Sequence, residues 1–322
     1  MKILKFKLFF GILFIFSVSV VTMALYGQSR QADHTNSFSQ SIPDRILYHQ
    51  LPQNTDKFLN NGDSKNVDLI GRWTEGPCWA VESQDDTIFF GNGGSFEIVD
   101  YSNRKYPERI GKFNLPSLGE DLKISKNYVY IANGYDGLRI IDIFNPHLPK
   151  EISHIYTGIY TKSITIKESY AYITNQQEGI SIVDISNPHK PVQVSYYNDI
   201  KNPMDIVVDS CYAYVLDFYT GLHVLDISDR DSPYEIAQFD NSDINYALFL
   251  KDNLIYVAMS GKGLSIVDIS DPDSLAEVGF ISTDDIALNV VVQDKYAYVA
   301  NGWSGLCVID ISSPGNPIKV SD

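Results

Sequence analysis

The chain has 322 residues, and its 25 lysines and arginines against 40 aspartates and glutamates give a formal net charge of -15. A chain of this length can form one large all-β domain, so length alone does not require two domains. The negative charge repels phosphate backbones and disfavours nucleic acid as a partner, whereas it favours metal ions and basic partners.

The first 27 residues predict a signal peptide or a membrane anchor. Lys2, Lys5 and Lys7 form a basic start, an apolar run follows from Leu8 to about Leu25, and Thr22-Met23-Ala24 offers a cleavage site. A run of this length could also stay uncleaved and span a bilayer, and both alternatives remain open. Either one predicts export, to the periplasm, the cell surface or the medium. Residues 28–66 are polar and predict a linker that leads into a domain over residues 67–322.

An apolar run that ends in aspartate recurs six times along this domain, and successive copies lie 42 residues apart without a gap. The marker residues are Asp100, Asp142, Asp184, Asp226, Asp268 and Asp310. Glycine stands five residues before the marker in every copy but the first. Glycine at this position can adopt a positive φ, which allows a tight turn. Repetition at one fixed period is the sequence signature of a repeat architecture.

Each period divides into four short strands separated by turn residues. In the second repeat we expect strands over Asp121–Ser125, Tyr128–Ala132, Leu138–Phe144 and Glu151–Tyr156. Four strands in about 40 residues is the size of a propeller blade, and one such sheet cannot bury both faces alone. The sequence therefore predicts an all-β fold, a β-propeller of six four-stranded blades. A strand over Val67–Thr74 is expected to complete the last blade and close the ring, with a seven-bladed ring as the alternative.

The three cysteines are too sparse to form a disulfide framework. They are Cys78, Cys211 and Cys307. Cys78 and Cys307 would fall in adjacent blades of a closed ring and could pair, but we favour small buried apolar side chains.

The marker and the turn after it resemble the LVIVD repeat family. Val183–Pro188 and Val267–Pro272 carry the resemblance most clearly, and Tyr170–Ile173 and Tyr296–Val299 also match. The resemblance implies a secreted or surface-located β-propeller of bacteria or archaea and implies no reaction. The first repeat departs most from the pattern.

The marker aspartates are expected to be structural, because a residue present in every blade maintains blades. An aspartate that ends a strand can accept hydrogen bonds from the backbone of the following turn. A site should instead break the symmetry. The residues 21 before each marker, near the start of the innermost strand, do so: Trp79, Asp121, Ser163, Asp205, Ala247 and Asn289.

Asp121, Asp205 and Asn289 fall in alternate repeats and would lie about 120° apart around a six-bladed ring. Three oxygen ligands completed by water suit Ca²⁺, so these residues are the candidate metal set. The favoured alternative is a polar, water-filled channel without an ion, which leaves the cofactor as none or Ca²⁺.

Aromatic side chains gather in the loops at the same end of the ring. They are Trp73, Trp79, Tyr135, Tyr160, Phe218, Tyr219 and Trp303. Exposed aromatics anchor proteins or sugars, although packing between loops would explain them equally well. The expected acidic rim around them consists of Glu75, Glu120, Asp243, Asp284 and Asp285.

No histidine pair has metal-ligand spacing, and no glycine-framed nucleophilic serine is present in the sequence. The leading hypothesis is therefore an exported, non-enzymatic scaffold that binds a protein or a glycan at the cell surface. A membrane would be a partner only through an uncleaved N-terminal segment. The rival is a calcium-dependent hydrolase or lactonase at the mouth of the central channel, by analogy with other six-bladed propellers.

Overall fold

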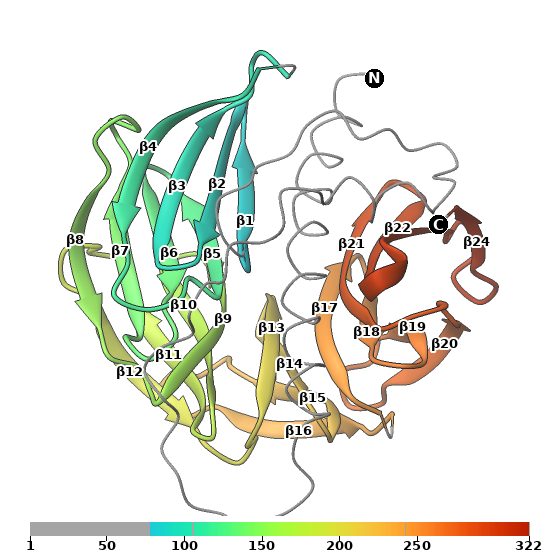
Figure 1. Ribbon diagram of the computed structural model, residues 1–322. Helices are drawn as coiled ribbons and strands as arrows, with labels where there is room; N and C mark the ends of the chain where they lie inside the picture. The colour runs from blue at the N-terminus through green and yellow to red at the C-terminus, as the bar shows by residue number, and fades with distance from the viewer. Residues whose placement is uncertain (1–77, 105, 242, 322) are drawn as a thin grey trace, which may run out of the picture.

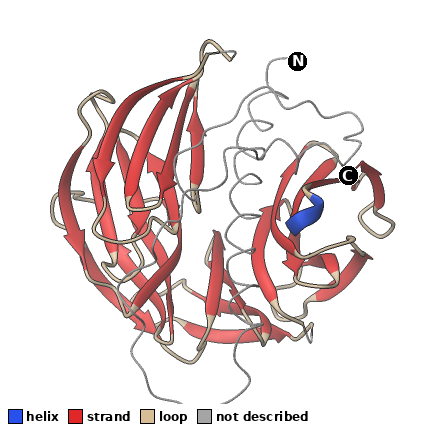
Figure 2. Ribbon diagram, viewed as in Figure 1, coloured by secondary structure: helices blue, strands red, loops and turns tan. Residues whose placement is uncertain are grey.

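The computed structural model describes residues 78–104, 106–241 and 243–321, and all structural statements below refer to these residues. They form six four-stranded antiparallel sheets, with one 3-10 turn at Gly302–Ser304 (Figures 1 and 2). The prediction of an all-β, six-bladed propeller is confirmed, and the seven-bladed alternative is not. Among the described residues there is no helix long and apolar enough to cross a membrane.

The first three blades follow the chain from residue 81 to residue 197. Blade 1 consists of β1 (Val81–Gln84), β2 (Thr87–Asn92), β3 (Ser95–Asp100) and β4 (Glu108–Asn114). Blade 2 consists of β5 (Asp121–Ser125), β6 (Tyr128–Ala132), β7 (Leu138–Asp142) and β8 (Lys150–Ile155). Blade 3 consists of β9 (Tyr160–Lys167), β10 (Tyr170–Gln176), β11 (Gly179–Asp184) and β12 (Val192–Tyr197).

The last three blades repeat this order to residue 321. Blade 4 consists of β13 (Pro203–Asp209), β14 (Tyr212–Asp217), β15 (Gly221–Asp226) and β16 (Tyr234–Phe239). Blade 5 consists of β17 (Asn245–Lys251), β18 (Leu254–Met259), β19 (Gly263–Asp268) and β20 (Ala276–Ile281). Blade 6 consists of β21 (Ala287–Gln293), β22 (Tyr296–Asn301), β23 (Leu306–Asp310) and β24 (Ile318–Ser321).

Strands in each blade are paired in chain order, and the first strand of each blade faces the centre of the ring (Figure 1). Consecutive first strands contact one another from β1 through β5, β9, β13 and β17 to β21. The loops that enter the first strands therefore share one end of the ring with the loops between second and third strands. We call this end the entry face, and the end with the loops between third and fourth strands the opposite face.

The hydrophobic core is divided among the junctions between consecutive blades. At the first junction Phe96 and Ile98 of blade 1 pack with Leu122 and Ile131 of blade 2. Equivalent clusters join each later pair up to blades 5 and 6. Second and third strands are buried along almost their whole length because a neighbouring blade covers each face. Burial by neighbours is what a repeat that cannot fold alone requires.

Each marker aspartate ends its strand by accepting a hydrogen bond from the backbone N–H two residues ahead. The six N···Oδ1 distances are 2.8 or 2.9 Å, as from Ser102 to Asp100 and from Ser312 to Asp310. The structural role expected of these residues is confirmed. The same bond explains why β7 ends at Asp142, two residues before the predicted end.

The turn glycines adopt the positive φ that their position predicted. Values run from +75° at Gly137 to +120° at Gly263. The first blade has Ser95 at this position and uses Gly93, at φ +59°, two residues earlier. Its turn is therefore built differently, which fits the departure of the first repeat from the pattern.

Two expectations about the ends of the chain have different outcomes. The proposed closing strand over 67–74 lies outside the described residues, as do the segments over 1–27 and 28–66. Blade 6 obtains its fourth strand from β24, which is short, as expected. None of the three cysteines forms a disulfide among the described residues, and Cys78 and Cys307 are buried, so small buried side chains are favoured over a disulfide.

Replacement of a turn glycine should destabilise the ring, and Gly179→Ala is the most informative case. A Cβ there would lie 2.0 Å from the carbonyl oxygen of Tyr197, at a φ of +87°. We expect the free energy of unfolding to fall by about 3 kcal/mol in urea titrations. Gly261→Ala is the control, because a Cβ there meets nothing within 4 Å. Equal stability of the two variants would contradict this account of the turn.

Candidate functional site

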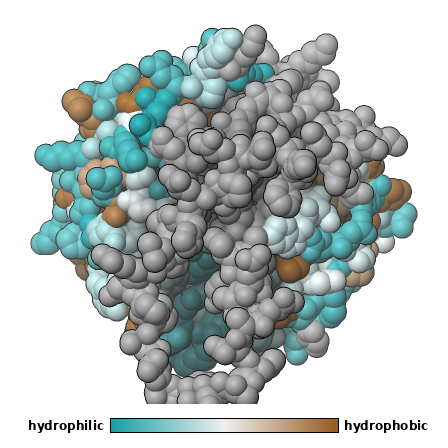
Figure 3. Space-filling model, in the orientation of Figure 1, coloured by the Kyte–Doolittle hydropathy of each residue, from teal (hydrophilic) through white to brown (hydrophobic). Residues whose placement is uncertain are grey.

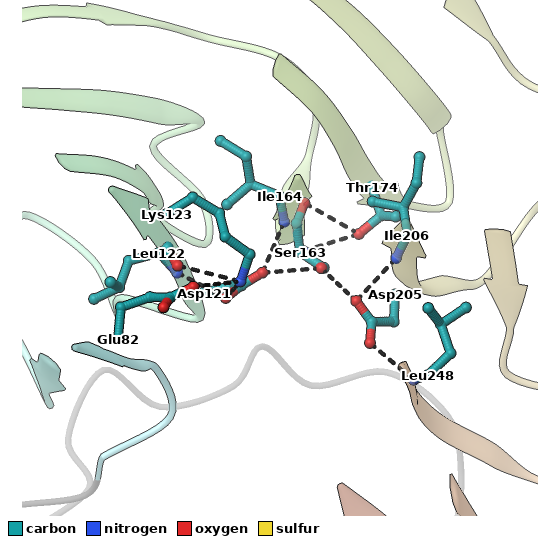
Figure 4. Close-up of polar contacts among 10 residues, drawn as sticks. All are labelled: Glu82, Asp121, Leu122, Lys123, Ser163, Ile164, Thr174, Asp205, Ile206 and Leu248. Carbon is teal, nitrogen blue, oxygen red and sulfur yellow. Dashed lines mark hydrogen bonds and ion pairs between the residues drawn. The ribbon is translucent and has the colours of Figure 1, made fainter. Parts of the chain in front are cut away.

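Two of the predicted metal-binding residues come together at the centre of the ring through a serine between them. Asp121 on β5, Ser163 on β9 and Asp205 on β13 occupy equivalent positions in three consecutive blades (Figure 4). The Ser163 hydroxyl oxygen lies 3.0 Å from Oδ2 of Asp121 and 2.7 Å from Oδ1 of Asp205. One hydroxyl thus joins the carboxyl groups of alternate blades.

Both carboxyl groups also accept backbone N–H groups, and they do so in the same pattern. Asp121 accepts the N–H of Leu122 at 2.8 Å and the N–H of Ile164, in the next blade, at 3.0 Å. Asp205 likewise accepts its own neighbour Ile206 at 2.9 Å. It also accepts Leu248 of the next blade at 2.9 Å. Each aspartate therefore fastens its blade to the following one.

The contacts among Asp121, Ser163 and Asp205 form a polar chain across the innermost strands. Lys123 extends this polar chain to the first blade. Its Nζ lies 3.2 Å from Oδ1 of Asp121 and 3.4 Å from Oε1 of Glu82 on β1. Burial alone would lower the pKa of Lys123, but the charges of Asp121, Glu82 and Asp205 outweigh burial and raise it. Burial raises the pKa of Glu82, and Lys123 opposes this effect. The resulting chain runs from β1 to β17, through five innermost strands.

The hydrogen bonds of the Ser163 hydroxyl constrain the protonation states of Asp121 and Asp205. A hydroxyl has one hydrogen and can donate it to only one of the two carboxyl groups. If both were ionised, one of the two close contacts would join two acceptors. A proton on Asp205 removes this conflict, because Asp205 can donate to Ser163 while Ser163 donates to Asp121. The Lys123 ammonium neutralises Asp121, which leaves Asp205 as the group that holds the proton.

The electrostatic surroundings of Asp205 agree with this assignment. Burial, followed by the charge of Asp121, raises the pKa of Asp205 to about 6. The N–H of Leu248, the Ser163 hydroxyl and Lys123 act in the other direction and do not cancel the effect. Asp205 thus titrates within the physiological range, whereas an exposed aspartate has a pKa near 4.

Two residues of the candidate metal set, Asp121 and Asp205, form hydrogen bonds within the chain. Four oxygens of Asp121 and Asp205 already accept hydrogen bonds from the chain. The side chain of Asn289, on β21, forms none of the hydrogen bonds found among the described residues, although its backbone pairs with β22. The described part of the chain also contains no group of three His, Cys, Asp or Glu side chains arranged for a metal. Calcium binding here remains a prediction, and the hydrogen bonds explain the two aspartates without it.

The predicted aromatic residues lie on the entry face in separate groups. Over blades 1 to 3, the Tyr135 ring meets Tyr160 edge-on at 4.8 Å, and Lys162 Nζ lies 5.6 Å from the Trp79 ring centre. Glu120 holds this group together, because it accepts a hydrogen bond from the Tyr160 hydroxyl and pairs with Lys162 at 2.5 Å. Tyr135 and Trp79 remain exposed.

A second group lies over blades 4 and 5. Phe218 contacts Tyr219 edge-on at 4.7 Å and Tyr246 at 5.7 Å, and the exposed ring of this group is Tyr219. Trp303, in the 3-10 turn of blade 6, is exposed as well. Trp73 lies outside the described residues.

The acidic rim is weaker than expected. Glu120 is buried and paired, so it holds aromatic side chains in place instead of presenting charge. Asp284 pairs with Lys319, and Asp285 accepts the backbone N–H groups of Ile286 and Ser304. Glu75 lies outside the described residues.

Sequence reasoning missed the side chains that connect the predicted ones. Ser163 stands at the same repeat position as Asp121 and Asp205, so its place was visible, but its role as a bridge was not. Lys123 follows two residues after Asp121, on the same face of a strand, which is the signal that could have identified it. Glu82 and Lys162 act across blades, and no spacing in the sequence shows that contact.

Comparison with known families decides the relationship. The LVIVD repeat matches residues 119–157, 158–199, 202–241, 247–283 and 286–322. The chain belongs to the LVIVD repeat family. These matches cover blades 2 to 6, and blade 1 keeps the LVIVD architecture although its sequence is not matched. A comparison with curated proteins found no match.

Solved structures share the fold at low sequence identity. The WD40 repeats of RRP9 superpose with a TM-score of 0.63 at 7% identity, over 77% of this chain and 81% of that one. A functionally unknown protein from Desulfotomaculum acetoxidans DSM 771 gives 0.60 at 12% identity, over 70% and 75%. The computationally designed Ika8 protein gives 0.59 at 10%, over 72% and 70%. These likenesses establish the propeller fold and nothing beyond it.

The shared proton predicts a pH dependence that Asp205→Asn should remove. The pKa of Asp205 is higher in the folded state than in the unfolded state. Its contribution to the free energy of unfolding is therefore fully present below about pH 4 and is lost as pH rises through about 6. An amide cannot ionise, so the free energy of unfolding of Asp205→Asn relative to wild type should rise by about 2 kcal/mol between about pH 4 and pH 8 in urea titrations. A constant offset accompanies this change, because the amide NH2 replaces one oxygen that accepts the N–H of Ile206 or Leu248.

Asp209→Asn, on the same strand, serves as the control, because Asp209 lies at the far end of β13 and pairs with Lys167 at 3.6 Å. A difference between Asp205→Asn and wild type that is constant with pH would show that Asp205 does not hold the proton.

Proposed function

We propose that this LVIVD propeller is an exported, non-enzymatic scaffold that binds a protein or a glycan at the cell surface through its entry face. The observation that carries the proposal is the set of exposed aromatic side chains held on this face. Tyr135, Tyr219 and Trp303 come from loops between second and third strands, in alternate blades. They therefore surround the mouth of the ring.

The aromatic groups are held in place before any ligand arrives. Tyr135 leans on Tyr160, which donates a hydrogen bond to the buried Glu120. The Tyr219 ring packs edge-on against Phe218, which in turn packs against Tyr246 of the next blade. Rigid aromatic anchors lose little conformational entropy on binding, which favours recognition of a partner surface or a sugar face.

The polar chain at the centre supports a scaffold more than a catalyst. Asp121 and Asp205 are the carboxyl groups on which a hydrolase would depend, and their oxygens hold neighbouring blades together. A general base must reach the proton that it abstracts, whereas these groups are directed at backbone N–H groups of the chain. Export rests on the basic and apolar N-terminal sequence.

The experiment measures binding of the labelled full chain to a glycan array and to intact cells, before and after protease treatment of the cells. We expect Tyr219→Ala and Trp303→Ala each to weaken binding at least tenfold, which is typical of a central aromatic anchor. Tyr234→Ala is the matched control, because it lies in the same blade as Tyr219, on the outer strand, and is 56% exposed against 60%.

Loss of binding after protease treatment would indicate a protein ligand, and retained binding together with array signals would indicate a glycan. Binding that neither entry-face variant weakens would contradict the proposal, as would turnover of a lactone or ester substrate that Asp205→Ala abolishes.

A further inference from the structure

One loop of the opposite face, in blade 2, has an apolar residue where the other five blades have serine. Two residues after the marker, blade 2 has Phe144, whereas the other five blades have serine: Ser102, Ser186, Ser228, Ser270 and Ser312. Four residues further on it has Leu148, where blades 4 and 5 have Ser232 and Ser274 and blade 1 has Tyr106, which is 67% exposed. Phe144 is 79% exposed and Leu148 is 74% exposed, more than any other large apolar side chain among the described residues.

Contacts between blades hold three loops of this face together. The β7–β8 loop lies against β4 of blade 1, because a Cβ added at Gly111 would be 2.0 Å from the carbonyl oxygen of Pro146. The β11–β12 loop lies against β8, because the Ser153 hydroxyl donates to the carbonyl oxygen of Pro188 at 2.5 Å. The β5–β6 turn lies beside the β7–β8 loop of the same blade, because the N–H of Ile143 donates to the carbonyl oxygen of Asn127 at 2.8 Å.

Positive charge accompanies the apolar side chains. Lys126 in the β5–β6 turn, Lys150 at the start of β8 and Lys190 in the β11–β12 loop are all exposed. None of the three has a carboxylate within ion-pair distance among the described residues. The corresponding loops of blades 4 and 5 carry four aspartates, Asp229, Asp231, Asp271 and Asp273, and one cation, Arg230. The loops of blades 2 and 3 on this face therefore carry exposed lysines where those of blades 4 and 5 are mainly acidic.

We propose that the patch formed by Phe144, Leu148, Lys126, Lys150 and Lys190 docks on an anionic lipid surface. The two apolar side chains enter the boundary between headgroups and acyl chains, and the ammonium groups face lipid phosphates. Figure 3 shows apolar surface at the tip of the β7–β8 loop, at the upper left, surrounded by hydrophilic surface.

A lipid surface fits the shape of this patch better than a peptide does. Side chains that are three-quarters exposed stand out from the molecule and have no walls around them. A peptide partner needs a groove or an open strand edge, whereas a bilayer accepts a protruding loop. The proposal is independent of the function assigned to the entry face, because the two ends of the ring share none of these residues.

The first test measures binding of the full chain to vesicles of phosphatidylglycerol and phosphatidylcholine, and to vesicles of phosphatidylcholine alone. The wild type should prefer the anionic vesicles at least tenfold, and added salt should weaken this preference. Phe144→Ser with Leu148→Ser should weaken binding to the anionic vesicles at least tenfold, because the apolar insertion is lost. Folding should survive, because both substitutions introduce residues that other blades carry at these positions.

The second test locates the contact, because the apolar run at residues 8–25 can bind lipid by itself. Phe144→Trp places an indole in the patch, and Tyr135→Trp places one on the entry face. With brominated phosphatidylglycerol, the extra fluorescence of Phe144→Trp should be quenched and that of Tyr135→Trp should not.

Equal quenching of the two variants, or quenching of neither, would overturn the proposal. So would a wild-type dimer that the double serine variant dissociates, because the patch would then be occupied by a second copy of the chain. An acidic protein that competes for the patch while vesicles leave the indole unquenched would overturn it in favour of a protein partner.

Discussion

A four-stranded blade cannot bury both of its faces alone, and every other feature of this protein depends on that constraint. The apolar clusters lie between blades, so each blade is stable only beside its neighbours. At the centre of the ring, where apolar packing ends, the junctions are made by polar groups. Asp121 and Asp205 each reach a backbone N–H of the following blade, and Ser163 joins the two aspartates.

The repeats tolerate change where a compensating partner changes too. In blades 1 and 2, the residue three before the marker is a buried charged side chain on the third strand, and it pairs with the fourth strand of its own blade. Blade 1 pairs Glu97 with Arg109 at 3.4 Å, and blade 2 exchanges the charges, with Arg139 and Glu151 at 2.6 Å. Such pairs keep a buried charge satisfied. Phe144 breaks the repeat without gaining a buried partner, and a change of this kind is the better indicator of a binding surface.

The sequence predicted the fold in detail because the repeat supplies six independent readings of one unit. The ring of six blades, the turn glycines and the marker aspartates all followed from register alone. Contacts between blades could not be predicted in this way, because they form only when the blades are arranged in a ring. Examples are the ion pairs of Glu82 with Lys123 and of Glu120 with Lys162. For the same reason the sequence could place Asp121 and Asp205 at equivalent positions but could not show that the Ser163 hydroxyl joins them.

The central claim is that the innermost aspartates hold blades together and do not depend on a bound ion. The most direct measurement is the thermal midpoint of the full chain at pH 8, with a calcium chelator and with added calcium. An ion bound only by the folded state would raise the midpoint by mass action. This account predicts the same midpoint in both conditions for the wild type and for Asp205→Asn. A fall of several degrees in the chelator, reversed by calcium and absent in Asp205→Asn, would contradict it and establish a metal site at the centre of the ring.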